Sequence, residues 1–371
     1  MEFNKSNPGI RFATGEQLLF FSTLRQRVDA YFEGNKLSPH ANAGMVLKTI
    51  LLLLAYIVPF ILMVVYTPSF LISLLCWSVM GLAMAGLGMS VMHDANHGAY
   101  SSSAKVNKWV GYTLNLVGGT VLNWKYQHNV LHHTYTNIAG MDDDIDSKAI
   151  LRFSPHGEKK KVHRYQWYYA FLFYSILTLY WGLLKDLVQY IQYKKAGLNR
   201  NTSKKNLIWL VRVTILKLIY FFVLLALPIW AGIPFYQVLI GFLVFHAIGG
   251  LILAIVFQMA HVVEETEFPM PAEDGAMKNS WAVHQLSTTM DFARHNKLLS
   301  WYVGGLNFQV EHHLFTRICH VHYPAISEIV KDTAQEYGVP YLEKKTLWEA
   351  FKSHVNYLKQ NGAPTLEEIG G

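Results

Sequence analysis

Four apolar stretches, each close to the length that crosses a lipid bilayer, constrain the fold of this chain more than any other feature. They run over residues 46–66, 70–91, 210–230 and 236–260. A helix needs about 20 apolar residues to span the hydrocarbon core. Only 15% of the chain is charged, whereas soluble proteins typically carry about 25%. We therefore predict an all-α integral membrane protein with four transmembrane helices.

The connections between these stretches predict how the helices pair. The first two are joined by Thr67-Pro68-Ser69 and the last two by residues 231–235. Both connections allow only tight turns, so we expect two antiparallel hairpins. Arg212 and Lys217 interrupt the third stretch. That helix is expected to begin outside the membrane, with Lys217 snorkelling or facing a cavity.

The distribution of basic residues predicts the sidedness. Residues 92–205 contain fifteen Lys or Arg and both terminal segments carry further basic residues, whereas neither short turn carries any. Positive charge is retained on the cytoplasmic side, so the termini and the central segment are expected there. The net charge of +7 is then explained by topology rather than by binding to nucleic acid, for which no motif is present.

This reading divides the chain into three parts. Residues 1–45 form a cytoplasmic N-terminal segment, 46–260 a membrane domain that includes the cytoplasmic insert 92–205, and 261–371 a helical cytoplasmic cap.

Two aromatic-rich stretches in the insert and two cysteines complete this outline. Residues 109–124 and 165–187 are expected to lie along the membrane surface as interfacial helices. The first forty residues lack the pattern of a cleavable signal peptide, so none is expected. Cys76 and Cys319 are expected to be reduced thiols.

Eight of the seventeen histidines gather where apolar stretches meet polar ones, all on the predicted cytoplasmic side. Imidazole is the commonest metal ligand among side chains, and one first-row ion rarely takes more than six ligands, so the clusters predict two metal ions. The candidate ligands, with one glutamine at matching spacing, are His93, His97, His128, His132, His133, His261, Gln309, His312 and His313.

Helical spacing explains how these residues could converge. His93 and His97 are four residues apart, as are His128 and His132, so each pair shares a helix face. His133 is turned by about 100° from His132, so one helix can address two ions. Gln309 precedes two adjacent histidines by three and four residues. His261 ends the fourth stretch at the depth where the second delivers its own cluster.

Simpler readings apply to single residues but not to the whole set. A lone histidine such as His261 is more often a hydrogen-bonded interface residue, and one His-x-x-x-His pair arises by chance. Two adjacent histidines with a third partner, found twice, are much rarer and favour metal binding. His246, inside the fourth stretch, is expected to make a packing or polar contact. A supporting role for His320 and His322 stays open.

A ligating imidazole needs its second nitrogen held by an acceptor. The nearest candidates in the sequence are Asp94, Asn129, Glu264, Glu265 and Glu311. Glu265 is expected in a surface ion pair rather than as a ligand. The acidic run 142–144 is either a solvated loop or a neighbour of the site.

Together the clusters HDANH, HNVLHH and QVEHH resemble the three histidine boxes of the membrane fatty acid desaturases. The resemblance spans most of the chain. Residues 306–315 resemble the third box of the front-end group, in which glutamine replaces the first histidine. The resemblance implies a di-iron centre held by the nine residues named above. The family also carries a metal-binding histidine at the cytosolic end of its fourth span, which matches His261.

The implied reaction is the O₂-dependent removal of two hydrogens from neighbouring methylenes of an acyl-CoA or acyl-lipid chain. In the front-end group the new cis double bond lies between an existing one and the carboxyl end. Attack on an unactivated C–H bond needs an oxidant that no ordinary side chain supplies, which two iron ions and O₂ would provide.

The sequence departs from the family in two places. Thr316 stands after the third box where proline is frequent. The His-Pro-Gly-Gly haem motif of a fused cytochrome b5 is also missing, so electrons are expected from a separate acidic protein, a cytochrome b5 or a ferredoxin. This favours the inner membrane of a bacterium over the endoplasmic reticulum.

Two other functions remain open at this stage. A fatty acyl or sphingolipid hydroxylase uses the same scaffold, although Gln309 favours front-end desaturation. A metal transporter would place ionisable residues near the middle of its spans, whereas these clusters lie at the span ends.

Overall fold

The computed structural model describes residues 9–15, 17–145, 150–199 and 201–363, and these are helical apart from one short sheet. The chain forms two compact units. Unit 1 contains the residues up to His40, 125–171 and those from 255 onward; unit 2 contains 41–124 and 172–254. Two of the boundaries fall inside α8 (Gln166–Ser175) and α13 (Phe235–His261), and the other two follow His40 and Trp124.

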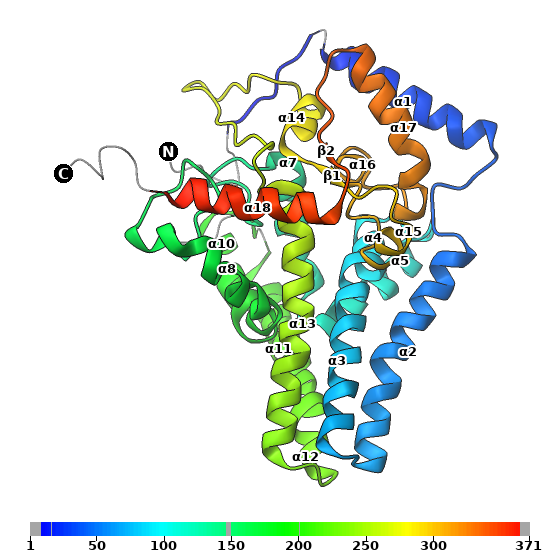
Figure 1. Cartoon of the computed structure of the whole chain (residues 1–371), viewed down its shortest axis with the longest axis vertical. Coiled ribbons are helices and arrows are strands. Elements are labelled where there is room, and N and C mark those ends of the chain that lie inside the picture. Colours follow the sequence, from blue (N-terminus) through cyan, green and yellow to red (C-terminus); the bar gives the residue numbers. More distant parts are fainter. Residues whose placement is uncertain (1–8, 16, 146–149, 200, 364–371) are drawn as a thin grey trace. The chain divides into compact units, whose positions relative to one another are not determined.

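Within the described residues, four helices are long and apolar enough to cross a membrane, as predicted. They span Ala43–Tyr66, Phe70–His97, Ser203–Trp230 and Phe235–His261. Each contains a predicted stretch and extends beyond it. In Figure 1 α2 and α3 run side by side as the first hairpin. The elements of unit 2 are α2 (Ala43–Tyr66), α3 (Phe70–Gly86), η1 (Leu87–Val91), α4 (Met92–His97), α5 (Ala104–Gly111), η2 (Tyr112–Val117), α6 (Val121–Trp124), α9 (Leu177–Tyr180), η5 (Trp181–Lys185), α10 (Asp186–Lys195), α11 (Ser203–Phe221), η6 (Phe222–Ala226) and α12 (Leu227–Trp230).

The third span begins at Ser203, where the Thr202 side chain caps the first turn by accepting from a backbone amide. The ammonium of Lys217 lies in an ion pair that the sequence did not predict. Nζ lies 2.9 Å from Asp186 Oδ2, and both side chains are largely buried. It also donates to the carbonyls of Gly118, Trp181 and Gly182. The charged side chain of Lys217 is tolerated inside an apolar helix because the adjacent Asp186 carboxylate neutralises its charge.

The two aromatic-rich stretches form short helices. The first is divided between α5, η2 and α6. The second forms a bent pair, Lys161–Ser175 and Leu177–Lys195, with a bend of 53°. Its length and composition would allow a broken fifth span as well as the surface position expected from the sequence.

Unit 1 packs its helices around a core of α1, α14, α16 and α17. The sheet is parallel, with Asp291 opposite Glu343 and Phe292 opposite Lys344. The elements of unit 1 are α1 (Gln17–Gly34), η3 (Lys125–His132), α7 (His133–Tyr135), η4 (Lys161–Tyr165), α14 (Trp281–Thr288), β1 (Asp291–Phe292), α15 (Lys297–Tyr302), α16 (Gln309–Leu314), η7 (His320–His322), α17 (Tyr323–Glu336), β2 (Glu343–Lys344) and α18 (Leu347–Gly362).

Side chains from this sheet and its neighbours hold α16, which carries the third histidine cluster. Asp291 Oδ1 accepts the backbone amide of Val310 at 3.0 Å, in the first turn of α16. The Tyr341 hydroxyl lies 2.7 Å from Asp291 Oδ2 and 3.0 Å from Glu311 Oε1. Every residue of α16 is buried. The helix is therefore fixed by polar contacts on one side and by the apolar core on the other.

Replacement of Lys217 tests the contribution of the buried Lys217–Asp186 ion pair to the stability of unit 2. Lys217→Met leaves the Asp186 carboxylate buried without its counter-charge, which typically costs about 3–5 kcal/mol. We expect a markedly lower thermal unfolding temperature in detergent, whereas Lys204→Met, at an exposed position on the same helix, should leave it unchanged. Equal unfolding temperatures for the two variants would contradict this role.

A pH dependence of stability is expected from His354 on α18. Its Nδ1 donates to the Val262 carbonyl at 2.7 Å, and burial lowers its pKa from 6.5 to about 4. As pH falls from about 6.5 towards 4 the unfolded chain takes up the proton first, so this contribution to stability is lost. At pH 5 the loss is about 2 kcal/mol.

Chemical unfolding of metal-stripped protein at pH 7 and pH 5 checks this prediction. His354→Gln keeps an N–H donor for Val262 but does not titrate, so its stability should change less between the two pH values than that of the unaltered chain. An identical change in both proteins would refute the assignment.

Candidate metal centre

In unit 1 three segments distant in sequence carry the candidate ligands. The second cluster lies on η3 and α7, His261 ends α13, and the third cluster lies on α16. All six histidines and Gln309 are buried. A polar set of this size is excluded from water only if its members have partners or bind a cation.

The second cluster lies on a π-helix rather than the α-helix assumed from its spacing. Residues Lys125–His132 form this segment, in which hydrogen bonds run between residues five apart. His133, five residues after His128, therefore becomes its neighbour, with 3.3 Å between the two Nε2 atoms. The ring of His132 stacks on His128 at 5.1 Å but belongs to a different group of donors. The wider helical turn thus separates the two adjacent histidines.

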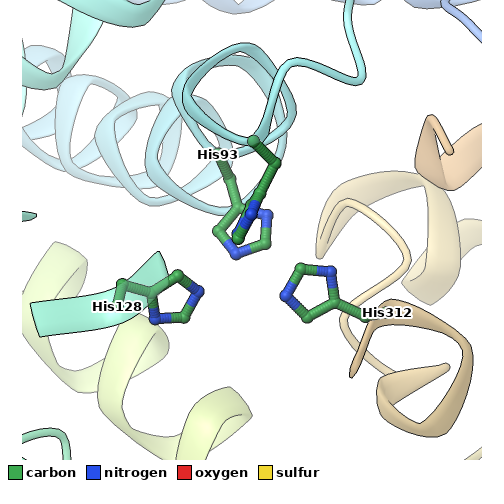
Figure 2. A group of neighbouring side chains, drawn as sticks. His93, His128 and His312 are labelled. Atoms are coloured by element: carbon green, nitrogen blue, oxygen red, sulfur yellow. The ribbon is translucent and has the colours of Figure 1, made fainter. Parts of the chain in front are cut away.

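The first group in unit 1 contains His128, His133 and His312. Besides the 3.3 Å spacing to His128, the Nε2 atom of His133 lies 3.1 Å from that of His312. Imidazole binds a first-row ion such as zinc at about 2.0–2.1 Å, which places two adjacent ligand atoms roughly 2.8–3.4 Å apart. Both spacings fit ligands of a shared ion. Figure 2 shows the rings of His128 and His312; His93, also labelled there, belongs to unit 2.

The second group contains His132, His261 and His313, with Gln309 beside it. One ring nitrogen of each histidine lies within 4.8 Å of the others. The amide nitrogen of Gln309 is 2.9 Å from His261 Nε2. Among the described residues, His132 Nε2 and Gln309 Oε1 are buried without a hydrogen-bond partner. Because buried polar atoms are normally paired, two acceptors left in this position fit a bound cation.

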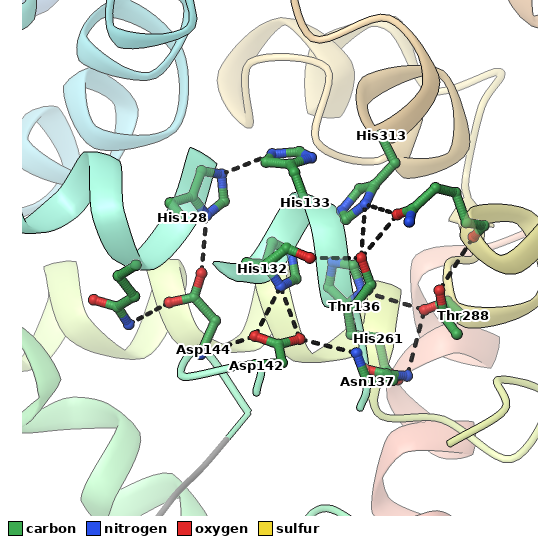
Figure 3. A network of polar contacts seen from close by, with 12 residues as sticks. His128, His132, His133, Thr136, Asn137, Asp142, Asp144, His261, Thr288 and His313 are labelled. Atoms are coloured by element: carbon green, nitrogen blue, oxygen red, sulfur yellow. Dashed lines mark hydrogen bonds and ion pairs between the residues drawn. The ribbon is translucent and has the colours of Figure 1, made fainter. Parts of the chain in front are cut away.

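Two carboxylates of the acidic run hold the ligands of η3. Asp144 Oδ2 lies 2.9 Å from His128 Nδ1, and both oxygens of Asp142 lie 3.0–3.1 Å from His132 Nδ1 (Figure 3). The alternative that the sequence left open is thereby resolved, because Asp142 is fully buried beside the site. It also accepts the backbone amide of Asn137. Each carboxylate fixes a proton on Nδ1, which leaves the Nε2 lone pair for a metal.

The electrostatics of the His132–Asp142 pair favour retention of a proton on His132. Burial lowers the pKa of His132, but the adjacent Asp142 carboxylate more than offsets this, so the pKa is raised overall.

Three further partners of ligand candidates come from positions that sequence proximity does not indicate. Tyr323 Oη lies 3.2 Å from His312 Nδ1, and Gln285 Oε1 lies 2.7 Å from His313 Nδ1. The Thr288 carbonyl lies 3.3 Å from His261 Nδ1. The sequence indicates only that a ligating imidazole needs an acceptor for its second nitrogen. It does not indicate where in the chain that acceptor lies.

Most of the residues that the sequence suggested as acceptors for the ligating imidazoles contact other groups instead. Glu264 accepts from α18, and Glu265 pairs with Lys344 as the expected ion pair. Glu311 faces Asp291 and Tyr341, and burial together with the Asp291 carboxylate raises the pKa of Glu311 well above its usual range. Asp94 and Asn129 lie on α4 and η3, where Asp94 is buried.

In unit 2, His93 and His97 share one face of α4, as their spacing predicted. Their ring centroids are 4.7 Å apart, and the ring of Trp124 contacts both at 5.7 and 5.5 Å. The π-helix η1 (Leu87–Val91) directly precedes α4. Trp124 thus gives this pair an apolar wall that limits the rotation of both rings.

Three histidines outside the clusters make ordinary hydrogen bonds. His246 lies 3.0 Å from Thr178 Oγ1 and 3.2 Å from Tyr220 Oη, a polar contact as expected. His284 and His322 contact backbone carbonyls of Thr136 and His40. Burial lowers the pKa of His284 to about 4, which keeps it neutral.

The chain belongs to the class of helical membrane proteins with buried clusters of imidazole, and outer acceptors hold five of these imidazoles. The donor set fits a metal, since neutral nitrogens dominate it and it contains orphaned buried acceptors.

Comparison with known sequences gives the family. The sequence pattern of the fatty acid desaturases matches residues 68–345. The chain is 36% identical over 347 residues to an sn-1 linoleoyl-lipid 6-desaturase of Arthrospira platensis, covering 93% of each chain. It is 37% identical to the sn-1 linoleoyl-lipid 6-desaturase of a Synechocystis species, covering 92% of this chain and 95% of the relative. An acyl-lipid (8-3)-desaturase of Physcomitrium patens is 34% identical over 95% of this chain and 74% of its own length.

This chain therefore belongs to the fatty acid desaturase family of oxidoreductases, and the resemblance inferred from its histidine boxes is confirmed.

The role of the acidic run can be tested on metal content. Asp142→Asn replaces an anionic acceptor by an amide that can offer N–H to His132 Nδ1, which would favour the tautomer that cannot bind through Nε2. Loss of such a partner typically weakens metal affinity by about 10–100-fold. We expect less bound metal per chain after dialysis against a chelator, measured by atomic emission. Asp143→Asn is the matched control, and equal metal retention in both variants would contradict the assignment.

Proposed function

We propose that this protein is a front-end acyl-lipid desaturase with two iron ions, which introduces a cis double bond into a chain attached to a membrane lipid. Support for the substrate class comes from the relatives, two of which are named as linoleoyl-lipid 6-desaturases and cover most of the chain. Gln309 at the start of the third box is the feature within the site that favours the front-end group. Linoleoyl-lipid is thus the first substrate to test.

We propose that each of the two groups of metal-binding side chains in unit 1 holds one of the two ions. His128, His133 and His312 would hold one ion, and His132, His261, His313 and Gln309 the other. The contacts within unit 1 support this division. His93 and His97, which share one face of α4, would complete the first set, as the family's first histidine box implies.

Iron is proposed because the reaction is a redox reaction, and zinc, the other common partner of imidazole, has no redox chemistry. With O₂ and two electrons from a donor, the ions would supply the oxidant that removes two hydrogens from neighbouring methylenes. The substrate yields two electrons and the donor two, and O₂ becomes two molecules of water. The chain itself holds the ions and buries the donors away from water. Asp142 and Asp144 accept the Nδ1 protons of His132 and His128.

The termini and the centre are proposed to lie on the cytoplasmic side, on the evidence of the basic central segment. The inner membrane of a bacterium is the proposed location. Electrons would come from a separate acidic protein, a cytochrome b5 or a ferredoxin, attracted by the basic surface. An acyl-CoA substrate and hydroxylation are the alternatives to be excluded by product analysis.

Expression in a host fed linoleic acid tests the proposal. We expect fatty acids two mass units lighter than linoleate, with the new double bond on the carboxyl side, and we expect them in the lipid fraction before any acyl-CoA pool. His132→Ala and His313→Ala should each abolish the product because each removes a ligand, whereas His295→Ala, at an exposed position, should not. Products sixteen mass units heavier would indicate hydroxylation instead.

A further inference from the structure

Gln285 occupies a position in unit 1 that the proposed metal chemistry does not yet explain. It lies on α14 and is fully buried. Its Oε1 atom is 2.7 Å from His313 Nδ1 and 2.8 Å from Thr136 Oγ1. Its Nε2 atom has no hydrogen-bond partner among the described residues. The side chain is thus fixed through its oxygen alone.

The contact has a consequence for the tautomer of His313. A neutral imidazole carries one N–H and one lone pair, on different nitrogens. An amide oxygen only accepts, so the 2.7 Å contact requires the proton of His313 on Nδ1. Nε2 then keeps the lone pair. Since one ring nitrogen of His313 lies within 4.8 Å of ligand atoms of His132 and His261, this tautomer is the one suited to bind the second ion.

The opposite orientation of the amide would have the opposite effect. An N–H of Gln285 directed at Nδ1 would require a lone pair there and drive the proton to Nε2, where it would block ligation. The structure directs the oxygen to this point, and the Thr136 hydroxyl is compatible with that orientation because its one proton can be donated to Gln285 Oε1 or to the His132 carbonyl. The same hydroxyl lies 2.7 Å from the carbonyl of His132 and 3.3 Å from His313 Nδ1 (Figure 3). It therefore links the segment of the second cluster to the helix of the third.

The acceptor on His313 also differs in charge from those on η3. His128 and His132 each face a carboxylate, whereas His313 faces a neutral amide. A carboxylate withdraws the Nδ1 proton more strongly and makes the imidazole a more electron-rich ligand. An amide leaves the ligand less electron-rich, which matters for a metal that must be reduced in each turnover.

We propose that Gln285 is a positioning residue of the desaturase, which fixes the tautomer of His313 so that Nε2 binds the second ion, and which moderates the electron donation of that ligand. The inference rests on the proposed function, in that it requires His313 to be an iron ligand.

Two substitutions of the purified, iron-loaded protein separate the possible roles of Gln285. Gln285→Leu removes the acceptor at similar volume, and we expect one of the two ions to be bound about 10–100-fold more weakly. Gln285→Glu keeps an acceptor and has no donor, so both ions should be retained. In that variant one of the two Mössbauer quadrupole doublets should shift, and the midpoint potential should fall. A purely structural role would not produce this spectroscopic change.

Ser287→Ala, another buried polar position on α14, serves as the control and should retain two ions with an unchanged spectrum. Unfolding temperatures of the metal-free variants show whether a loss of iron reflects a loss of fold; if Gln285→Leu fails to fold, Gln285→Glu alone decides. Iron affinity of Gln285→Leu equal to the unaltered protein would overturn the proposal. Loss of an ion, or an unshifted spectrum, in a folded Gln285→Glu would overturn it as well. Failure of the unaltered protein to bind iron would instead refute the proposed function.

Discussion

An acceptor on the outer nitrogen of an imidazole selects the tautomer whose lone pair points inward, and much of the structure around this centre supplies such acceptors. The acidic loop after η3 returns to deliver Asp142 and Asp144 to Nδ1 atoms. The helices α14 and α17 deliver Gln285 and Tyr323 to the third cluster. Buried amides and carboxylates would otherwise destabilise the fold, so the same contacts serve both stability and ligand geometry.

The π-helical segments show how local backbone geometry adapts to this requirement. In η3 the five-residue repeat brings His128 beside His133 and directs His132 to the other group. In an α-helix His128 and His132, four residues apart, would share one face. Both would then be directed at the same ion. Segments of this kind are energetically unfavourable in isolation and occur most often at functional sites. Here the imidazole contacts and the two carboxylates provide the compensating interactions.

In the membrane spans, charged and polar side chains are buried in apolar surroundings and need partners there. Lys217 and Asp186 neutralise each other, and three backbone carbonyls lie within hydrogen-bonding distance of the same ammonium. These carbonyls surround the buried ammonium with polar acceptors in an otherwise apolar part of unit 2. His246 is accommodated by hydroxyl groups instead, and it needs no charge. Polar residues within these helices therefore stabilise packing and are not evidence of an ion pathway.

The sequence by itself determined the four spans, the nine candidate ligands and the family, because hydropathy and the spacing of histidines are properties of neighbouring residues. It could not assign Lys217 to Asp186, Gln285 to His313 or Tyr323 to His312, since each of these pairs joins residues more than ten positions apart and leaves no periodic trace. The division of the unit 1 ligands into two groups likewise depended on the tertiary structure. Whether a helix adopts α or π geometry is decided by the contacts its side chains make, and those contacts exist only after the chain has folded.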